Sequence, residues 1–133
     1  MPDERLIPAR RVKSRKDFLR VQKEGRKVRS EHFLLAHCSR VPSEQESRIG
    51  VTITTKIDKR AARRNRLRRR VRDIFRKHHS RLLGAHDIVV IALTGAVDLA
   101  YDEVKHEILS SFRKARLLPD RPREARVNRP GNG

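Results

Sequence analysis

The chain has 133 residues, the usual length of a single domain, and a formal net charge of +18 from 34 lysine and arginine residues against 16 acidic ones. A charge this large predicts a polyanionic partner, either nucleic acid or an anionic membrane, because neutralising it releases counterions. The start of the chain lacks an apolar signal segment, no stretch approaches about 18 apolar residues, and Cys38 is the only cysteine, so we expect a cytoplasmic protein without disulfides or a membrane span.

The first predicted elements are a basic arm over residues 1–13 and a short helix over about 15–24. Ser14 and Asp17 form a capping-box pattern at the start of this helix. Gly25 stands where a glycine commonly ends a helix.

Two later segments have the character of strands. Residues 32–38 are a short apolar run, and residues 48–55 alternate between apolar and polar side chains and are rich in β-branched residues. The apolar side chains that share one face of the second strand are Ile49, Val51 and Ile53. The short polar loop at 41–47 predicts that the two strands pair antiparallel.

Residues 59–83 switch to the helical period and contain the segment RRNRLRRRVR at 63–72. Residues 59–72 alone hold nine basic residues. Six residues recur at helical spacing and form one apolar stripe along the predicted helix: Leu67, Val71, Ile74, Phe75, His78 and Leu82. We expect this stripe, more than intrinsic propensity, to hold the cationic segment helical up to Gly84.

The rest of the chain predicts one strand, one helix and a tail. Residues 87–93 are a continuous apolar run, typical of a strand covered on both faces, and residues 101–116 return to the helical period. The strands at 48–54 and 87–93 flank a helix and are candidates for parallel neighbours. Residues 1–118 form one domain, and residues 119–133, with three prolines and two glycines, predict a disordered basic tail. The fold class is α+β, a single-sheet sandwich in the order α-β-β-(β)-α-β-α with the bracketed strand optional.

No motif for catalysis by protein side chains is found. Cys38 lies in a predicted strand, where a buried inert thiol is usual. The neighbours His78 and His79 point about 100° apart on a helix and do not suit one metal ion. We expect no catalytic and no metal-ligating residue in the protein.

The long helix predicts a surface for a polyanion instead. Arg60, Arg64, Arg68 and Arg72 fall in one row, and arginine suits forked phosphate contacts and stacking on bases. A merely solvated charged face is the alternative, which the density of basic residues disfavours. The polar face of the strand at 48–55, beside Phe18, is a second candidate surface, suited to a single strand. On pattern alone we favour core packing for Phe18.

The sequence RIGVTITTKIDKRAARRNRLRRRVRDIFR at 48–76 resembles the signature of the protein component of bacterial ribonuclease P. The matching positions are the strand Arg48-Ile49-Gly50-Val51-Thr52, then Lys56, the block Arg64-Asn65-Arg66, and Phe75. The likeness extends over roughly residues 8–118. It implies a protein subunit of an endoribonuclease, whose large catalytic RNA removes the 5′ leader of precursor tRNA.

The resemblance also implies the partners and the topology. The partners are the catalytic RNA and precursor tRNA, with no membrane and no obligate protein partner, and the cofactor is Mg²⁺ bound mainly by the RNA. A left-handed crossover is implied between the parallel strands, whereas the general rule favours a right-handed one.

The resemblance places the long helix against the catalytic RNA, through Lys56, Lys59, Arg60, Arg63, Arg64, Asn65, Arg66, Arg68, Arg69 and Arg72. It places the leader between the first helix and the sheet, against Lys13, Phe18, Gln22, Leu34, Ala36, Thr52 and Thr54. Gln22 and Ala36 stand where relatives carry aromatic residues, which predicts weaker stacking of the leader.

Two other classes share the charge and composition. A structural RNA-binding protein of ribosomal type is the main alternative, and a DNA-compacting protein is the other. The Arg64-Asn65-Arg66 block directly after a glycine-containing strand favours the ribonuclease P subunit.

Overall fold

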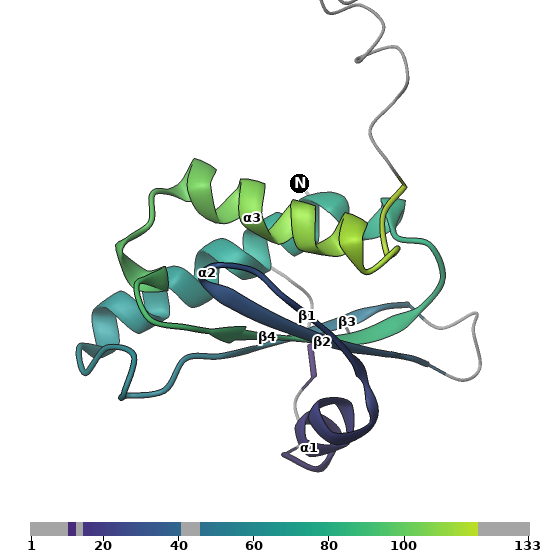
Figure 1. Ribbon diagram of the computed structural model, residues 1–133, viewed down its shortest axis with the longest axis horizontal. Helices are drawn as coiled ribbons and strands as arrows, with labels where there is room; N and C mark the ends of the chain where they lie inside the picture. Colours follow the sequence, from purple (N-terminus) through teal and green to yellow (C-terminus); the bar gives the residue numbers. More distant parts are fainter. Residues whose placement is uncertain (1–10, 13–14, 41–45, 120–133) are drawn as a thin grey trace, which may run out of the picture.

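The computed structural model describes residues 11–12, 15–40 and 46–119. Its elements are α1 (Arg15–Glu24), β1 (Arg26–Arg29), β2 (Phe33–Ser39), β3 (Arg48–Thr52), α2 (Ala61–His78), β4 (His86–Ala92) and α3 (Tyr101–Lys114), with the short 3₁₀ helices η2 (His79–Arg81) and η3 (Ala96–Asp98). The α+β class and the predicted order, including the optional strand, are confirmed (Figure 1). Lys13, the predicted cap Ser14, most of the predicted amino-terminal arm and the predicted tail from residue 120 lie outside the described residues.

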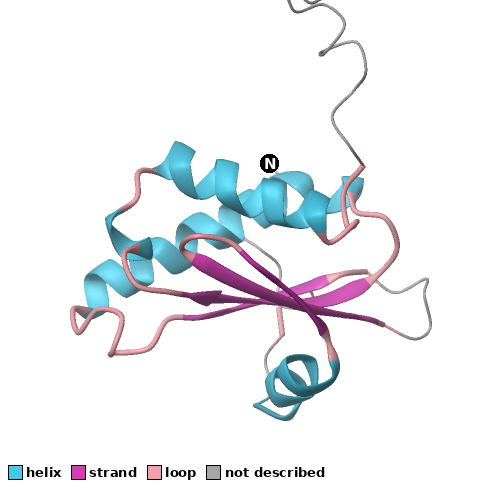
Figure 2. Cartoon of the chain, viewed as in Figure 1, coloured by secondary structure: helices cyan, strands magenta, loops and turns pink. Residues whose placement is uncertain are grey.

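The sheet separates two layers of helices. α2 and α3 lie on one face and α1 lies on the other (Figure 1; Figure 2). The strand order is β1-β2-β4-β3, in which β3 and β4 are parallel, as expected, and the other neighbours are antiparallel. The left-handed sense of the crossover stays a prediction.

The predicted antiparallel pairing of strands 32–38 and 48–55 is wrong. β4 inserts between β2 and β3, so β2 pairs with β1 and β4 instead. A short loop between two consecutive strands permits pairing but does not require it, because tertiary contacts of later segments compete.

β1 is the element that no sequence pattern located. Its four residues are Arg26, Lys27, Val28 and Arg29, and only Val28 is partly buried. Val28 pairs with Leu35 of β2 at the edge of the sheet. A charged edge strand resists pairing with another chain, and it lacks the apolar alternation by which strands are recognised.

The main core lies between the sheet and the pair α2 and α3. Its buried members from β3 and the following residue are Ile49, Val51 and Ile53, and those from α2 are Leu67, Val71, Ile74 and Phe75. The predicted stripe is shorter than expected, since α2 ends at His78 and both His78 and Leu82 are only half-buried. In the described ranges, no helix combines the length and apolar character needed to cross a membrane.

The other face of the sheet carries a much smaller apolar cluster. In the described part of the chain, its fully buried members are Val21 of α1, Ala36 of β2 and Val89 of β4. Gly25 follows α1 as predicted, but it is required for close packing: an added Cβ would lie 2.5 Å from the carbonyl oxygen of Val21 and 2.6 Å from that of His37.

Candidate nucleic-acid interface

α2 begins at a buried carboxylate that the sequence alone does not single out. Asp58 accepts hydrogen bonds from the backbone N–H of Arg60 at 2.8 Å and from the Arg60 guanidinium at 3.1 and 3.2 Å. These bonds hold the pKa of Asp58 below its usual value. The carbonyl oxygen of Asp58 also accepts a bond from Arg64 at 2.9 Å. Asp58 therefore anchors a helix whose first turn contains no acid.

One predicted RNA contact, Arg63, turns toward the protein, as does Arg70, which is not among the predicted contacts. Arg63 forms ion pairs with Asp58 and Asp98, and Arg70 donates to the carbonyl oxygen of Leu99 at 2.8 Å. These contacts tie α2 to the segment that leads into α3. Both side chains thus stabilise the fold, which their positions on a helical wheel did not reveal.

Other predicted residues form an outward surface that we call the arginine face, consisting of Lys56, Lys59, Arg60, Arg64, Asn65, Arg66, Arg68, Arg69 and Arg72. The side chains of Arg66 and Arg69 are exposed and have no hydrogen-bond or ion-pair partner among the described residues. Asn65 is also exposed, and its Oδ1 accepts a hydrogen bond from Arg68 at 2.8 Å. Asn65 therefore orients an arginine of this surface.

Arg72 is half-buried at one side of the arginine face. Its Nε is buried, and the described residues provide no acceptor for it. Burial lowers the pKa of Arg72, and the nearby positive charges of Arg11 and Arg68 lower it further. A guanidinium in these surroundings favours an oxyanion as partner, because an unpaired buried charge is costly.

The second candidate surface is a hollow of about 460 Å³ beside α1. We call it the α1 hollow; its lining residues are Arg15, Phe18, Leu19, Gln22 and Thr52. Three residues predicted to bind the leader therefore come together. The sequence-based prediction lacks Arg15 and Leu19, although helical spacing places them on the same face of α1.

Phe18 has both of the roles weighed from the sequence. Its ring packs against the sheet at Gly50, where an added Cβ would come within 2.6 Å of the ring carbon Cζ. The ring also contacts the small apolar cluster, yet Phe18 is only half-buried and lines the α1 hollow. Gly50 thus lets the ring lie close to the strand while one part remains accessible.

The remaining predicted leader contacts do not line the α1 hollow. Ala36 is 0% exposed beneath α1, so the expectation that it contacts a ligand is corrected: it supports the hollow from below. Leu34 is half-buried two residues before it on β2, and Thr54 is exposed beyond the end of β3. Lys13 lies outside the described residues.

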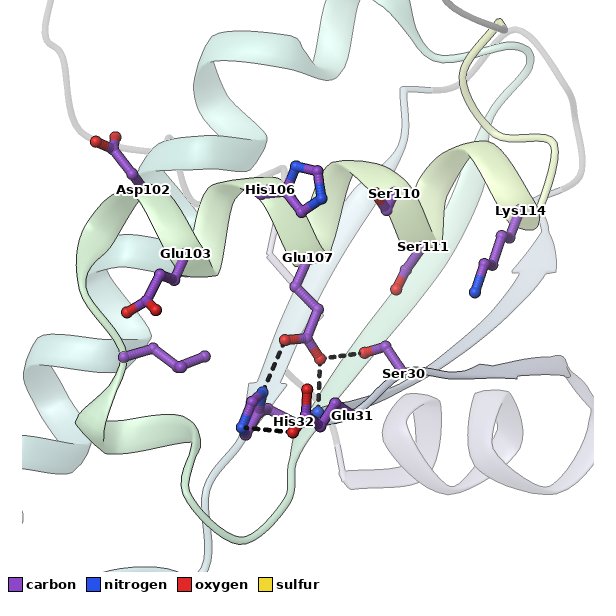
Figure 3. A pocket seen from close by; sticks show the side chains of 11 residues that line it. Ser30, Glu31, His32, Asp102, Glu103, His106, Glu107, Ser110, Ser111 and Lys114 are labelled. Atoms are coloured by element: carbon purple, nitrogen blue, oxygen red, sulfur yellow. Dashed lines mark hydrogen bonds and ion pairs between the residues drawn. The ribbon is translucent and has the colours of Figure 1, made fainter.

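A hollow of about 520 Å³ beside α3 has the opposite charge (Figure 3). Its acidic and histidine lining residues are Glu31, His32, Asp102, Glu103, His106 and Glu107. Glu107 points toward the turn between β1 and β2, where it accepts hydrogen bonds from Ser30 and from the backbone N–H of His32, the latter at 2.6 Å (Figure 3). Burial opposes ionisation of Glu107, but these bonds outweigh it and lower its pKa. This surface repels a polyanion.

Comparisons with known proteins identify the family of the chain. A family model described as Ribonuclease P matches residues 6–116. The ribonuclease P protein component of Bacillus pumilus is 29% identical over 115 residues, covering 86% of this chain and 95% of that protein. The one from Desulfovibrio desulfuricans is 34% identical over 118 residues, covering 86% and 90%.

Solved structures show the same similarity. The RNase P protein of Staphylococcus aureus superimposes with a TM-score of 0.74 at 30% sequence identity, covering 83% of this chain and 98% of that one. The RNase P protein of Thermotoga maritima superimposes with a TM-score of 0.70 at 30% identity, covering 78% and 96%.

Proposed function

The chain belongs to the ribonuclease P protein family, and we propose that it binds two different RNA molecules through two separate surfaces. Its family membership makes it an RNA-binding subunit of the endoribonuclease that matures the 5′ end of tRNA. The arginine face of α2 binds the catalytic RNA. The α1 hollow binds the single-stranded 5′ leader of precursor tRNA. The protein acts in the cytoplasm and needs no obligate protein partner.

The observation that carries the proposal is the pair of exposed guanidinium groups of Arg66 and Arg69, which have no partner among the residues that the structure describes, beside the half-buried Arg72. The apolar core behind α2 holds the helix backbone in place, so RNA binding has to order only the arginine side chains. Each phosphate they contact releases condensed counterions, which is the main source of affinity for RNA.

The leader assignment follows from the chemistry of the α1 hollow. A single strand has unstacked bases, and the accessible part of the Phe18 ring offers one of them an aromatic surface. Arg15 offers a cation to the backbone, while Gln22 and Thr52 offer hydrogen bonds. Mature tRNA lacks the leader, so it binds more weakly and leaves after cleavage.

Magnesium is assigned mainly to the RNA in this proposal. In the described part of the chain, no group of three or more histidine, cysteine or acidic residues has the arrangement to hold a metal ion. In this proposal the protein's own residues bind and orient RNA, and Mg²⁺ held by the RNA would supply charge stabilisation at the cleaved phosphate.

The test is reconstitution with the organism's catalytic RNA at low magnesium, with leader cleavage and affinities for precursor and mature tRNA as readouts. Phe18→Ala is expected to weaken precursor binding by roughly 1–3 kcal/mol and to affect mature tRNA little. Gln22→Phe is expected to strengthen precursor binding selectively. If both variants fold and the precursor-to-mature affinity ratio is unchanged, the leader binds elsewhere.

Two leucines of equal exposure provide a matched control. Leu19, which is 52% exposed, lines the α1 hollow, whereas Leu83, which is 51% exposed, lies outside it. Leu19→Ala is expected to lower the affinity ratio and Leu83→Ala to leave it unchanged. Equal effects would indicate a general loss of apolar surface instead of a leader site.

A further inference from the structure

A buried ionic cluster lies on the α1 side of the sheet. Asp87, at the start of β4, has a side chain that is 1% exposed and faces three arginines. Arg48 of β3 contacts both carboxylate oxygens at 2.8 Å, Arg20 of α1 donates to Oδ2 at 2.5 Å, and the Nε of Arg40 lies 3.5 Å from Oδ1. Burial opposes ionisation of Asp87, but the hydrogen bonds and charge of Arg48 outweigh it and lower its pKa.

The same cluster holds α1 at two points, three residues apart. The Nη2 of Arg48 lies 3.3 Å from the Oδ2 of Asp17, and the Nη1 of Arg20 lies 3.0 Å from the Sγ of Cys38 on β2. Residues three apart lie on one face of a helix. We call Asp17, Arg20, Arg40, Arg48 and Asp87 the Asp87 cluster.

Apolar contacts alone fix α1 poorly. Val21 is the single fully buried residue among the ten of this helix. A small apolar contact is non-directional and tolerates rotation or sliding of the helix, whereas paired guanidinium and carboxylate groups have a preferred geometry. The Asp87 cluster is therefore the part of the interface that sets the rotation of α1 about its axis.

One face of β3 joins this cluster to the α1 hollow. Arg48, Gly50 and Thr52 alternate along the strand and so share a face. Arg48 holds α1, Gly50 receives the ring of Phe18, and Thr52 lines the hollow. A change at Arg48 or Asp87 therefore reaches the Phe18 ring at Gly50, two residues along the strand, and the α1 hollow at Thr52, two residues further.

We propose that Asp87 is a positioning residue for the precursor-tRNA leader: it fixes α1 so that Phe18 lies on Gly50 and the α1 hollow keeps its shape. The proposal rests on the assignment of this hollow to the leader. Asp87→Asn keeps the shape of the side chain but leaves Arg48 and Arg20 against a neutral group. α1 then shifts, while the arginine face, on the opposite side of the sheet, is unaffected.

The experiment compares Asp87→Asn with Asp73→Asn, the same substitution in an ion-paired aspartate on the other side of the sheet. Asp73 contacts Arg76 at 2.6 Å and Lys77 at 3.2 Å, and it accepts a hydrogen bond from Tyr101 at 2.7 Å. In the reconstituted holoenzyme, Asp87→Asn is expected to lower the precursor-to-mature affinity ratio about fivefold or more, and Asp73→Asn less than about twofold. Affinity for the catalytic RNA stays unchanged in both.

Two further measurements separate positioning from loss of stability. In protein alone, the nuclear Overhauser effect between the Phe18 ring and Gly50 is expected to weaken in Asp87→Asn and to persist in Asp73→Asn. In the double variant Phe18→Ala with Asp87→Asn, the loss in affinity ratio is expected to be smaller than the sum of the two single losses, because Asp87 acts in part through this ring. Arg20→Gln, which keeps the Arg48–Asp87 pair, replaces Asp87→Asn if that variant does not fold.

The outcomes also separate this proposal from the function on which it rests. If Phe18→Ala leaves the affinity ratio unchanged, the leader assignment itself fails. If Phe18→Ala lowers the ratio while Asp87→Asn and Arg20→Gln do not, the positioning role is wrong. Additive losses in the double variant, or an equal weakening of all RNA ligands, overturn it as well.

Discussion

Charge serves opposite purposes in the Asp87 cluster and on the arginine face. In the cluster, a carboxylate that is 1% exposed is surrounded by arginines and ties α1 to the sheet. On the arginine face, Arg66 and Arg69 are exposed without partners in the described part of the chain, and the buried side of α2 is apolar. The number of arginines therefore says less about function than the position of the acids, because an arginine opposite a buried acid stabilises the fold.

The largest expected effect comes from placing a charge on the wrong side of α2. Val71 is 0% exposed in the main core, and Val71→Asp buries a carboxylate without a partner there. We expect the free energy of unfolding to fall by more than about 4 kcal/mol, enough to unfold the domain, as measured by urea denaturation. Arg69→Asp is the control, since it adds the same acid at an exposed position of the helix. A stably folded Val71→Asp protein would show that we have assigned the wrong face.

The next effect concerns affinity for RNA, with only a small loss of stability. Replacing Arg64 and Arg68 by alanine is expected to weaken binding to the catalytic RNA and to reduce the salt slope by roughly one unit per lost phosphate contact. Arg63→Ala and Arg70→Ala form the matched pair, because these side chains contact the 96–100 segment. We expect the matched pair to lower the melting temperature more and the salt slope less. Identical salt slopes in wild type and the first double variant contradict the assignment of the arginine face to the catalytic RNA.

A smaller effect tests how Asn65 acts. Asn65→Ala is expected to reduce affinity for the catalytic RNA by roughly 1 kcal/mol at fixed salt, since it removes the hydrogen bond that orients Arg68. In an Arg68→Ala background the same substitution is expected to cost nothing. A loss that persists in this background indicates a direct contact of Asn65 with RNA, and no loss in either background indicates a surface residue without a role.

The smallest expected effect is a pH dependence of stability that arises from His37 and not from the Asp87 cluster on the other side of the sheet. Burial lowers the pKa of His37 below 6.5, and the nearby His86 and Arg26 lower it further, so the folded protein holds this ring neutral. Its contribution to stability is complete above about pH 6.5 and is lost as the pH falls below this value. The pKa of Asp87 lies below 3.8, so the Asp87 cluster stays ionised in this window.

Urea unfolding between about pH 7.5 and pH 5.5 measures this contribution. We expect the free energy of unfolding of the wild type to decrease as the pH falls through this range. We expect a smaller decrease in the His37→Gln variant. An equal decrease in the variant would assign it to other groups.

Local patterns predicted most of the fold and part of the site. The alternation of Ile49, Val51 and Ile53 and the stripe around Val71 were sufficient for β3 and α2, because each pattern is complete within a few turns or residues. The partners of Asp87 are not local: Arg48 is 39 residues away and Arg20 is 67. A lone acid before an apolar run carries no signal of such contacts, and the role of Gly50 under the Phe18 ring is hidden for the same reason.

The position of β4 inside the sheet has a consequence for synthesis of the chain on the ribosome. β4 separates β2 from β3 and is the last strand to be made, so the earlier strands have no completed sheet to join until residues 86–92 emerge. At about 5–20 residues per second, the arginine-rich segment of α2 therefore waits roughly one to several seconds without its core, as an unfolded polycation beside ribosomal RNA. Nascent chains that stop before β4 should bind RNA non-specifically without folding, because β4 completes the sheet and the later α3 completes the core against which α2 packs.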